Sequence, residues 1–124
     1  VEGNRAYVTL HNGTRCGDSE NELHVVDITD LANPALLISR KMDNPMGLAV
    51  VDGIAYVCDG ANVRILDVRD EKNIKELSVI AIGSSYDLIY SDGLLVVTAP
   101  NGIYIFNVTN PSDPVKISEI LNIS

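Results

Sequence analysis

The sequence has few aromatic and few basic residues. Its 124 residues include no tryptophan, one phenylalanine, and nine lysines and arginines against 17 acidic residues. The formal net charge of −8 argues against a nucleic-acid-binding protein, because such proteins gather Lys and Arg into patches. It also argues against adhesion to anionic lipid. No stretch approaches the roughly 20 consecutive apolar residues of a membrane span. We therefore expect no nucleic acid and no membrane span, and we attribute the acidity to solubility.

Cysteine is also scarce. The two residues, Cys16 and Cys58, are too few for a disulfide scaffold, and they are either free thiols or one bridge. The apolar content of 46% excludes disorder, and the length suits one domain. The chain begins at Val1 with neither a start methionine nor a leader, so we expect that residues precede it in a longer protein.

A pattern of apolar residues recurs along the chain. Asp27, Asp67 and Asn107 are separated by 40 residues each, and the apolar residues before them keep the same spacing. The first copy carries nine extra residues within positions 11–22. A fixed period of this length is typical of repeat architectures. We predict one domain with repeats at residues 3–46, 47–86 and 87–124.

Each repeat contains up to four runs rich in Val, Ile, Leu and Tyr, which favour strands. The predicted strands are residues 6–10, 23–28, 35–42, 47–51, 54–58, 63–68, 74–82, 87–91, 94–98, 103–108 and 115–121. Asp-Gly, Asn-Gly and Asn-Pro pairs separate many of them and predict tight turns. No segment has the spacing of an amphipathic helix over a useful length.

One predicted strand indicates how the sheets are arranged. Val63 and Ile65 point to one face of the strand and Leu66 and Val68 to the other, so both faces require cover. Four-stranded sheets packed face to face around an axis meet this requirement. We therefore predict an all-β fold of about three four-stranded antiparallel β-propeller blades. The Asx residues that end these strands are expected to accept N–H groups of the following turn.

The repeats resemble the LVIVD repeat family. The residues that carry the resemblance are Leu23–Asp27 with the following Thr29–Pro34, Val63–Asp67, and Ile103–Asn107 with the following Asn110–Pro114. The linking residues Asp52–Val57 resemble the family's next element. The middle copy departs from this pattern, because residues 69–74 lack the Asn-Pro pair. The resemblance implies a bacterial or archaeal β-propeller, extracellular or at the cell surface, with no established common activity.

Three repeats are too few to close a propeller, which usually has four to eight blades. The first repeat also lacks its innermost strand, so the chain holds eleven predicted strands. Open end blades would expose apolar faces and unpaired edges. We expect a partial or half propeller that is completed either by the missing blades of a longer chain or by self-association, with a dimer forming a six-bladed ring.

In a propeller the links between blades and every second turn lie at the same end as the channel mouth. The candidate binding residues at this end are His11, Arg15, Asp18, Glu20, Asp43, Asp59, Tyr86 and Asp87. Asp87 is the first residue of an innermost strand. It either binds a ligand or cation near the axis or is a hydrogen-bonded structural residue. Asp18, Glu20 and Glu22 lack the complete calcium-loop pattern, and no zinc spacing occurs. His24 matches Arg64 and Tyr104 in a column of large amphipathic residues, so we interpret His24 as a packing position.

No catalytic, cofactor-binding or metal-binding motif occurs in the sequence. Our first hypothesis is a non-catalytic binding or scaffold module that presents loops to a protein or glycan partner. The alternative is a fragment of a propeller enzyme whose channel-mouth catalytic residues come partly from missing blades. Acids or histidines at equivalent positions of successive blades would favour the enzyme. The equivalent positions differ here, since Gly47 corresponds to Asp87 and Asp59 to Ala99, and this difference favours the binding module. A truncated product without function is a third possibility.

Overall fold

The computed structural model describes residues 1–11 and 21–121, and every regular element among them is a strand. The strands are β1 (Arg5–Leu10), β2 (Glu22–Asp27), β3 (Ala35–Lys41), β4 (Pro45–Val51), β5 (Ile54–Asp59), β6 (Asn62–Asp67), β7 (Lys75–Ala81), β8 (Asp87–Ser91), β9 (Leu94–Ala99), β10 (Gly102–Asn107) and β11 (Val115–Leu121). All eleven predicted strands are present, with ends close to those expected. The all-β prediction is confirmed.

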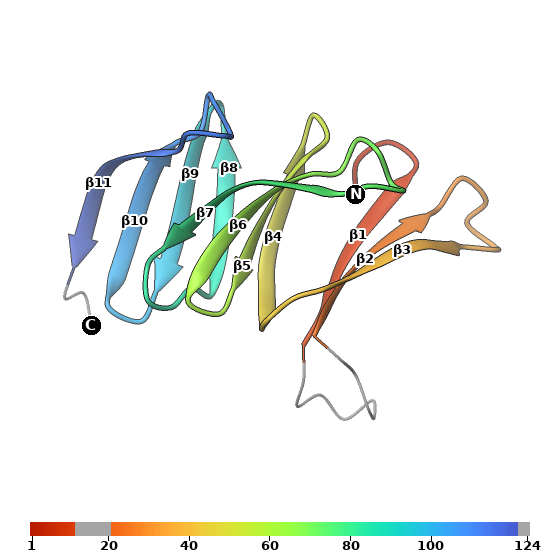
Figure 1. Ribbon diagram of the computed structural model, residues 1–124, viewed down its shortest axis with the longest axis horizontal. Helices are drawn as coiled ribbons and strands as arrows, with labels where there is room; N and C mark the ends of the chain where they lie inside the picture. Colours follow the sequence, from red (N-terminus) through yellow and green to blue (C-terminus); the bar gives the residue numbers. More distant parts are fainter. Residues whose placement is uncertain (12–20, 122–124) are drawn as a thin grey trace.

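The strands form three antiparallel sheets, in which each strand pairs with the next along the chain. Blade 1 comprises β1–β3, blade 2 comprises β4–β7 and blade 3 comprises β8–β11. Figure 1 shows the three sheets side by side, with the inner strands β4 and β8 at the junction of blades 2 and 3. Blade 1 has three strands because it lacks the equivalent of β4 and β8. The arrangement is that of consecutive propeller blades.

Tight hairpins join the two inner strands of blades 2 and 3. Asp52 and Gly53 have φ values of 51° and 75°, and Asp92 and Gly93 have values of 50° and 82°. Two successive residues with positive φ are required by the hairpin turn that matches strand twist, and Asp-Gly supplies them at low cost. We call this end of the blades, at the top of Figure 1, the hairpin end. The opposite end, which carries residues 43–46, 59–62 and 83–86, is the connection end.

The core lies between the blades. Val63 and Ile65 pack with residues of blade 3, whereas Leu66 and Val68 pack with residues of blade 1. All four are at most 2% exposed. The prediction that both faces of this strand are covered is confirmed, and it explains why the strand lacks polar alternation.

The Asx residue that ends the third strand of each repeat bonds to the turn that follows, as predicted. Asp27 Oδ1 accepts the N–H of Thr29 at 2.9 Å, and Asn107 Oδ1 accepts that of Thr109 at the same distance. Asp67 Oδ1 accepts the N–H of Arg69 at 3.0 Å. Arg69 also donates from its guanidinium to both carboxylate oxygens of Asp67, at 3.0 and 2.6 Å.

These bonds predict an acid-sensitive contribution of Asp67 to stability. The hydrogen bonds from the Arg69 side chain and backbone lower the pKa of Asp67 to about 2, below an unfolded value of about 3.9. The stabilisation is therefore complete above the unfolded pKa and is lost as the pH falls through the folded pKa. In urea unfolding between about pH 5 and 2, we expect Asp67→Asn to lose less stability than the wild type. Equal losses would contradict this role. Asn107 is the equivalent residue in blade 3 and accepts the N–H of Thr109, so an asparagine at position 67 can keep the backbone hydrogen bond.

Candidate functional site

The connection end was the predicted binding surface. Its links do meet, because Gly60 N–H donates to Asn44 O at 3.1 Å and Ser85 N–H donates to Gly60 O at 3.0 Å. Three of the predicted residues, Arg15, Asp18 and Glu20, lie outside the described residues. The other five are placed at or beside this end of the blades.

Asp59 is the centre of a polar network at this end. Its side chain is fully buried, and Oδ1 accepts the N–H groups of Asp43 and Asn44 at 2.9 and 2.7 Å. Oδ2 accepts Arg64 Nε at 2.6 Å. Arg64 also donates to Asp43 and Glu76, at 2.9 and 2.7 Å. Asp59, a predicted binding residue, is therefore not presented to solvent, and Arg64 is the centre of three ion pairs.

The remaining predicted residues do not converge on one site. The carboxylate of Asp43 is 69% exposed but pairs with Arg64, and His11 is half-buried after β1. Tyr86 is 49% exposed. Asp87 opens the innermost strand β8 as predicted, and its Oδ1 accepts the N–H of Leu88 at 2.8 Å. Asp43, Asp59 and Asp87 thus make hydrogen bonds or ion pairs within the chain, whereas Tyr86 is exposed.

The hairpin end holds a cavity that the sequence analysis missed. It has a volume of about 340 Å³ and lies between blades 2 and 3. Its walls are Asp52, Ile54, Tyr56, Tyr90, Asp92, Gly93, Val108, Thr109 and Pro111. The sequence analysis assigned the Asp-Gly pairs only to turns and the tyrosines only to strands. The cavity arises from turns of two different blades, and that proximity depends on how the blades stack.

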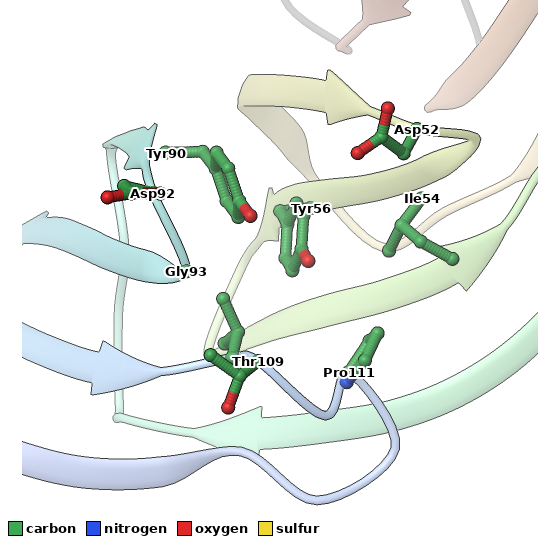
Figure 2. Close-up of a pocket in the computed structure, with 9 residues that line it drawn as sticks. Asp52, Ile54, Tyr56, Tyr90, Asp92, Gly93, Thr109 and Pro111 are labelled. Carbon is green, nitrogen blue, oxygen red and sulfur yellow. The ribbon is translucent and has the colours of Figure 1, made fainter.

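Two stacked tyrosines form one wall of this cavity. The rings of Tyr56 and Tyr90 are 5.4 Å apart with an interplanar angle of 25°. Figure 2 shows both hydroxyl groups directed toward the side of the cavity bordered by Ile54 and Pro111. Tyr56 is 3% exposed, and burial, together with the nearby Tyr90 and Asp52, raises its pKa to about 12. Its hydroxyl is therefore protonated at neutral pH.

An ion pair lies at the equivalent place between blades 1 and 2. Strand pairing makes Arg5 the equivalent of Ile54, since these residues lie opposite Asp27 and Asp67 respectively. Arg5 donates to Glu71, which corresponds to Pro111, and its Nη1 lies 3.3 Å from Asp27. Between blades 2 and 3 the apolar residues Ile54 and Pro111, which line the cavity, stand in place of this ion pair.

A second hollow, of about 480 Å³, lies near the outer strands of blades 2 and 3. Its lining is Ile80, Ala81, Ile82, Tyr104, Phe106, Lys116 and Glu119. Lys116 Nζ and Glu119 Oε2 pair with each other at 3.2 Å. Its charges are thus already neutralised, and the cavity at the hairpin end is the better candidate for a polar ligand.

Other kinds of site receive no support from the described part of the chain. Within residues 1–11 and 21–121, no three His, Cys, Asp or Glu side chains gather as metal ligands. Among the same residues, no helix is long and apolar enough to cross a membrane. Cys58 is a buried free thiol, and burial raises its pKa to about 11, whereas Cys16 lies outside the described residues.

Comparison with known proteins supports the fold. A functionally unknown protein from Desulfotomaculum acetoxidans DSM 771 is similar with a TM-score of 0.68 and 14% identity, over 79% of this chain and 34% of that one. The N-terminal domain of Nup159 is similar with a TM-score of 0.58 and 17% identity, over 96% and 29%. The chain thus spans about a third of the length of these structures. No curated protein matches.

Residues 1–41 match the LVIVD repeat family. The matched segment ends with the last residue of β3 and so coincides with blade 1. The resemblance seen in the sequence is confirmed over this segment. The chain is an all-β repeat protein of propeller-like blades, and its residues 1–41 match the LVIVD repeat.

Proposed function

We propose that this chain is a non-catalytic binding module whose two end blades each bind a second copy of the chain. The observation that carries the proposal is that some apolar positions of blades 1 and 3 are exposed although their equivalents in blade 2 are buried or partly buried. Val8 of blade 1 is 41% exposed, whereas its equivalent Val57 is fully buried. Ile120 of blade 3 is 52% exposed, whereas its equivalent Ile80 packs against the core.

The open faces of blades 1 and 3 are complementary because they repeat the two faces that meet at each junction within the chain. The face of blade 2 toward blade 1 carries Ala55, Val57, Leu66 and Val68, and the face of blade 3 toward blade 2 carries Leu95, Val97, Phe106 and Val108. The corresponding open face of blade 1 carries Ala6, Val8, Val26 and Ile28. At each junction within the chain, a face of this kind packs against the opposite face of the preceding blade. The open face of blade 3 is such an opposite face, so it is suited to bind the open face of blade 1.

Head-to-tail contacts of this kind can close a ring of two copies. The ring would present the connection-end loops to a protein or glycan partner. The resemblance to LVIVD proteins supports a surface or secreted location in a bacterium, which cell fractionation would test. The difference between the equivalent residues Gly47 and Asp87 supports binding over catalysis.

Two matched substitutions test the pairing of faces. Ile120→Glu places a charge on the open face of blade 3, whereas Val79→Glu places one on blade 2, at a position that is 41% exposed. We expect Ile120→Glu to halve the solution mass and Val79→Glu to leave it unchanged, because burying an unpaired carboxylate is costly. Equal masses for the two variants, with circular dichroism showing both folded, would overturn the proposal.

A further inference from the structure

The cavity at the hairpin end has an uncompensated acidic character. Two of its lining residues, Asp52 and Asp92, are acidic and none is basic. The Arg69 side chain lies against the turn at Gly53 on the same end, and its guanidinium already donates to both carboxylate oxygens of Asp67. The chain as a whole carries a formal charge of −8, which adds to the attraction for cations.

The cavity also contains a tyrosine hydroxyl without a protein partner. Tyr56 as a whole is only 3% exposed, and among the described residues its hydroxyl makes no hydrogen bond but remains accessible at the cavity surface. Buried tyrosine hydroxyls usually have a partner. Figure 2 shows this hydroxyl and that of Tyr90 on the same side of the cavity, with Asp52 on its border. The arrangement offers two hydroxyl oxygens and a carboxylate to a donor.

The junction between blades 1 and 2 shows which chemical group occupies the position equivalent to this cavity. Between blades 1 and 2 the equivalent position is occupied by the guanidinium of Arg5, beside Tyr7, which corresponds to Tyr56. Arg5 is held there by Glu71 and Asp27. Between blades 2 and 3 the cation is absent because Ile54 stands in place of Arg5. A tyrosine remains, and acidic side chains supplied by Asp52 and Asp92 border the cavity.

We propose that the cavity binds a primary alkylammonium group. Its three N–H donors match the Asp52 carboxylate and the hydroxyl oxygens of Tyr56 and Tyr90. Ile54 and Pro111 then lie beside the alkyl chain. A volume of about 340 Å³ is within the range of small-ligand sites. The tyrosines use their faces to stack on each other, so they offer hydroxyl groups rather than open rings, which disfavours a sugar. A lysine side chain of a partner and a free alkylamine share this chemistry.

The test is a titration of ¹⁵N-labelled protein with n-butylammonium chloride at constant ionic strength, followed by amide chemical shifts. We expect saturable shifts at Gly53, Tyr56 and Gly93. The uncharged analogue n-butanol should give no saturation at the same concentrations. Nα-acetyl-lysine amide distinguishes the sources: tighter binding than butylammonium indicates a lysine of a partner protein, and equal or weaker binding indicates a free amine.

Three variants make the test specific. Asp52→Asn should weaken butylammonium binding about tenfold or more, because the carboxylate charge that strengthens the hydrogen bond to the ammonium is lost. Asparagine tolerates the positive φ of this turn. Tyr56→Phe should weaken binding by a smaller factor. Asp87→Asn removes the same charge at the opposite end of β8, where an amide oxygen can still accept the N–H of Leu88, and should have no effect.

Absence of saturable shifts with butylammonium would overturn the proposal, and so would equal affinities for Asp52→Asn and Asp87→Asn. The titration is repeated on Ile120→Glu, whose substitution lies on the open face of blade 3. Binding by this variant supports the cavity even if the two copies do not pair. The pairing of two copies and the binding of an alkylammonium group can therefore be contradicted independently of each other.

Discussion

Replacing Asp59 with alanine is expected to lower the free energy of unfolding by about 3–5 kcal/mol. The carboxylate is fully buried and accepts two backbone N–H groups, from Asp43 and Asn44, in addition to Arg64 Nε. Removing it leaves two donors unpaired and deprives Arg64 of its buried counterion. The affected backbone belongs to the link between blades 1 and 2, so the substitution loosens the start of β4.

Urea unfolding at neutral pH measures this effect. Asp113→Ala, in an exposed turn before β11, is the matched control and should change stability by less than about 0.5 kcal/mol. Asp59→Asn should lie between the wild type and Asp59→Ala, because the amide oxygen still accepts a backbone N–H. A loss below about 1 kcal/mol for Asp59→Ala would show that the network contributes little.

Truncating the core between blades 1 and 2 should have a similar effect. Leu66 is fully buried in the cluster that joins these blades, so Leu66→Ala should cost about 2–5 kcal/mol through lost burial and the cavity that remains. Val79→Ala, at a 41% exposed position of the same blade, should cost less than about 1 kcal/mol. Thermal and urea unfolding give both values. Equal costs would mean that the blades do not pack through this face.

Most of the fold can be predicted from the sequence because its causes are local or periodic. The 40-residue spacing of Asp27, Asp67 and Asn107 aligns the repeats, and Asp-Gly pairs mark the hairpins. The apolar residues on both faces of β6 require a blade on each side. Each inference depends on neighbours along the chain or on the same position in another repeat, and both are visible in one sequence.

The polar features are harder to predict because they depend on how the blades stack. Asp59 has no acidic equivalent in blade 3, where Ala99 takes its place, and one of its partners, Asp43, comes from the preceding link. The cavity at the hairpin end is defined by a difference between two junctions. Arg5 and Glu71 form an ion pair at one junction, whereas Ile54 and Pro111 line the cavity at the other. Neither pair is adjacent in the sequence, so no motif reveals it.

The central claim is that each blade requires a neighbour on both faces, so that the open faces of blades 1 and 3 bind those of a second copy. The solution mass of this chain, measured by light scattering after size exclusion, tests it most directly. The account predicts a single species of twice the chain mass of 13.4 kDa, folded and stable to dilution into the micromolar range. A folded monomer of 13.4 kDa at these concentrations would contradict it.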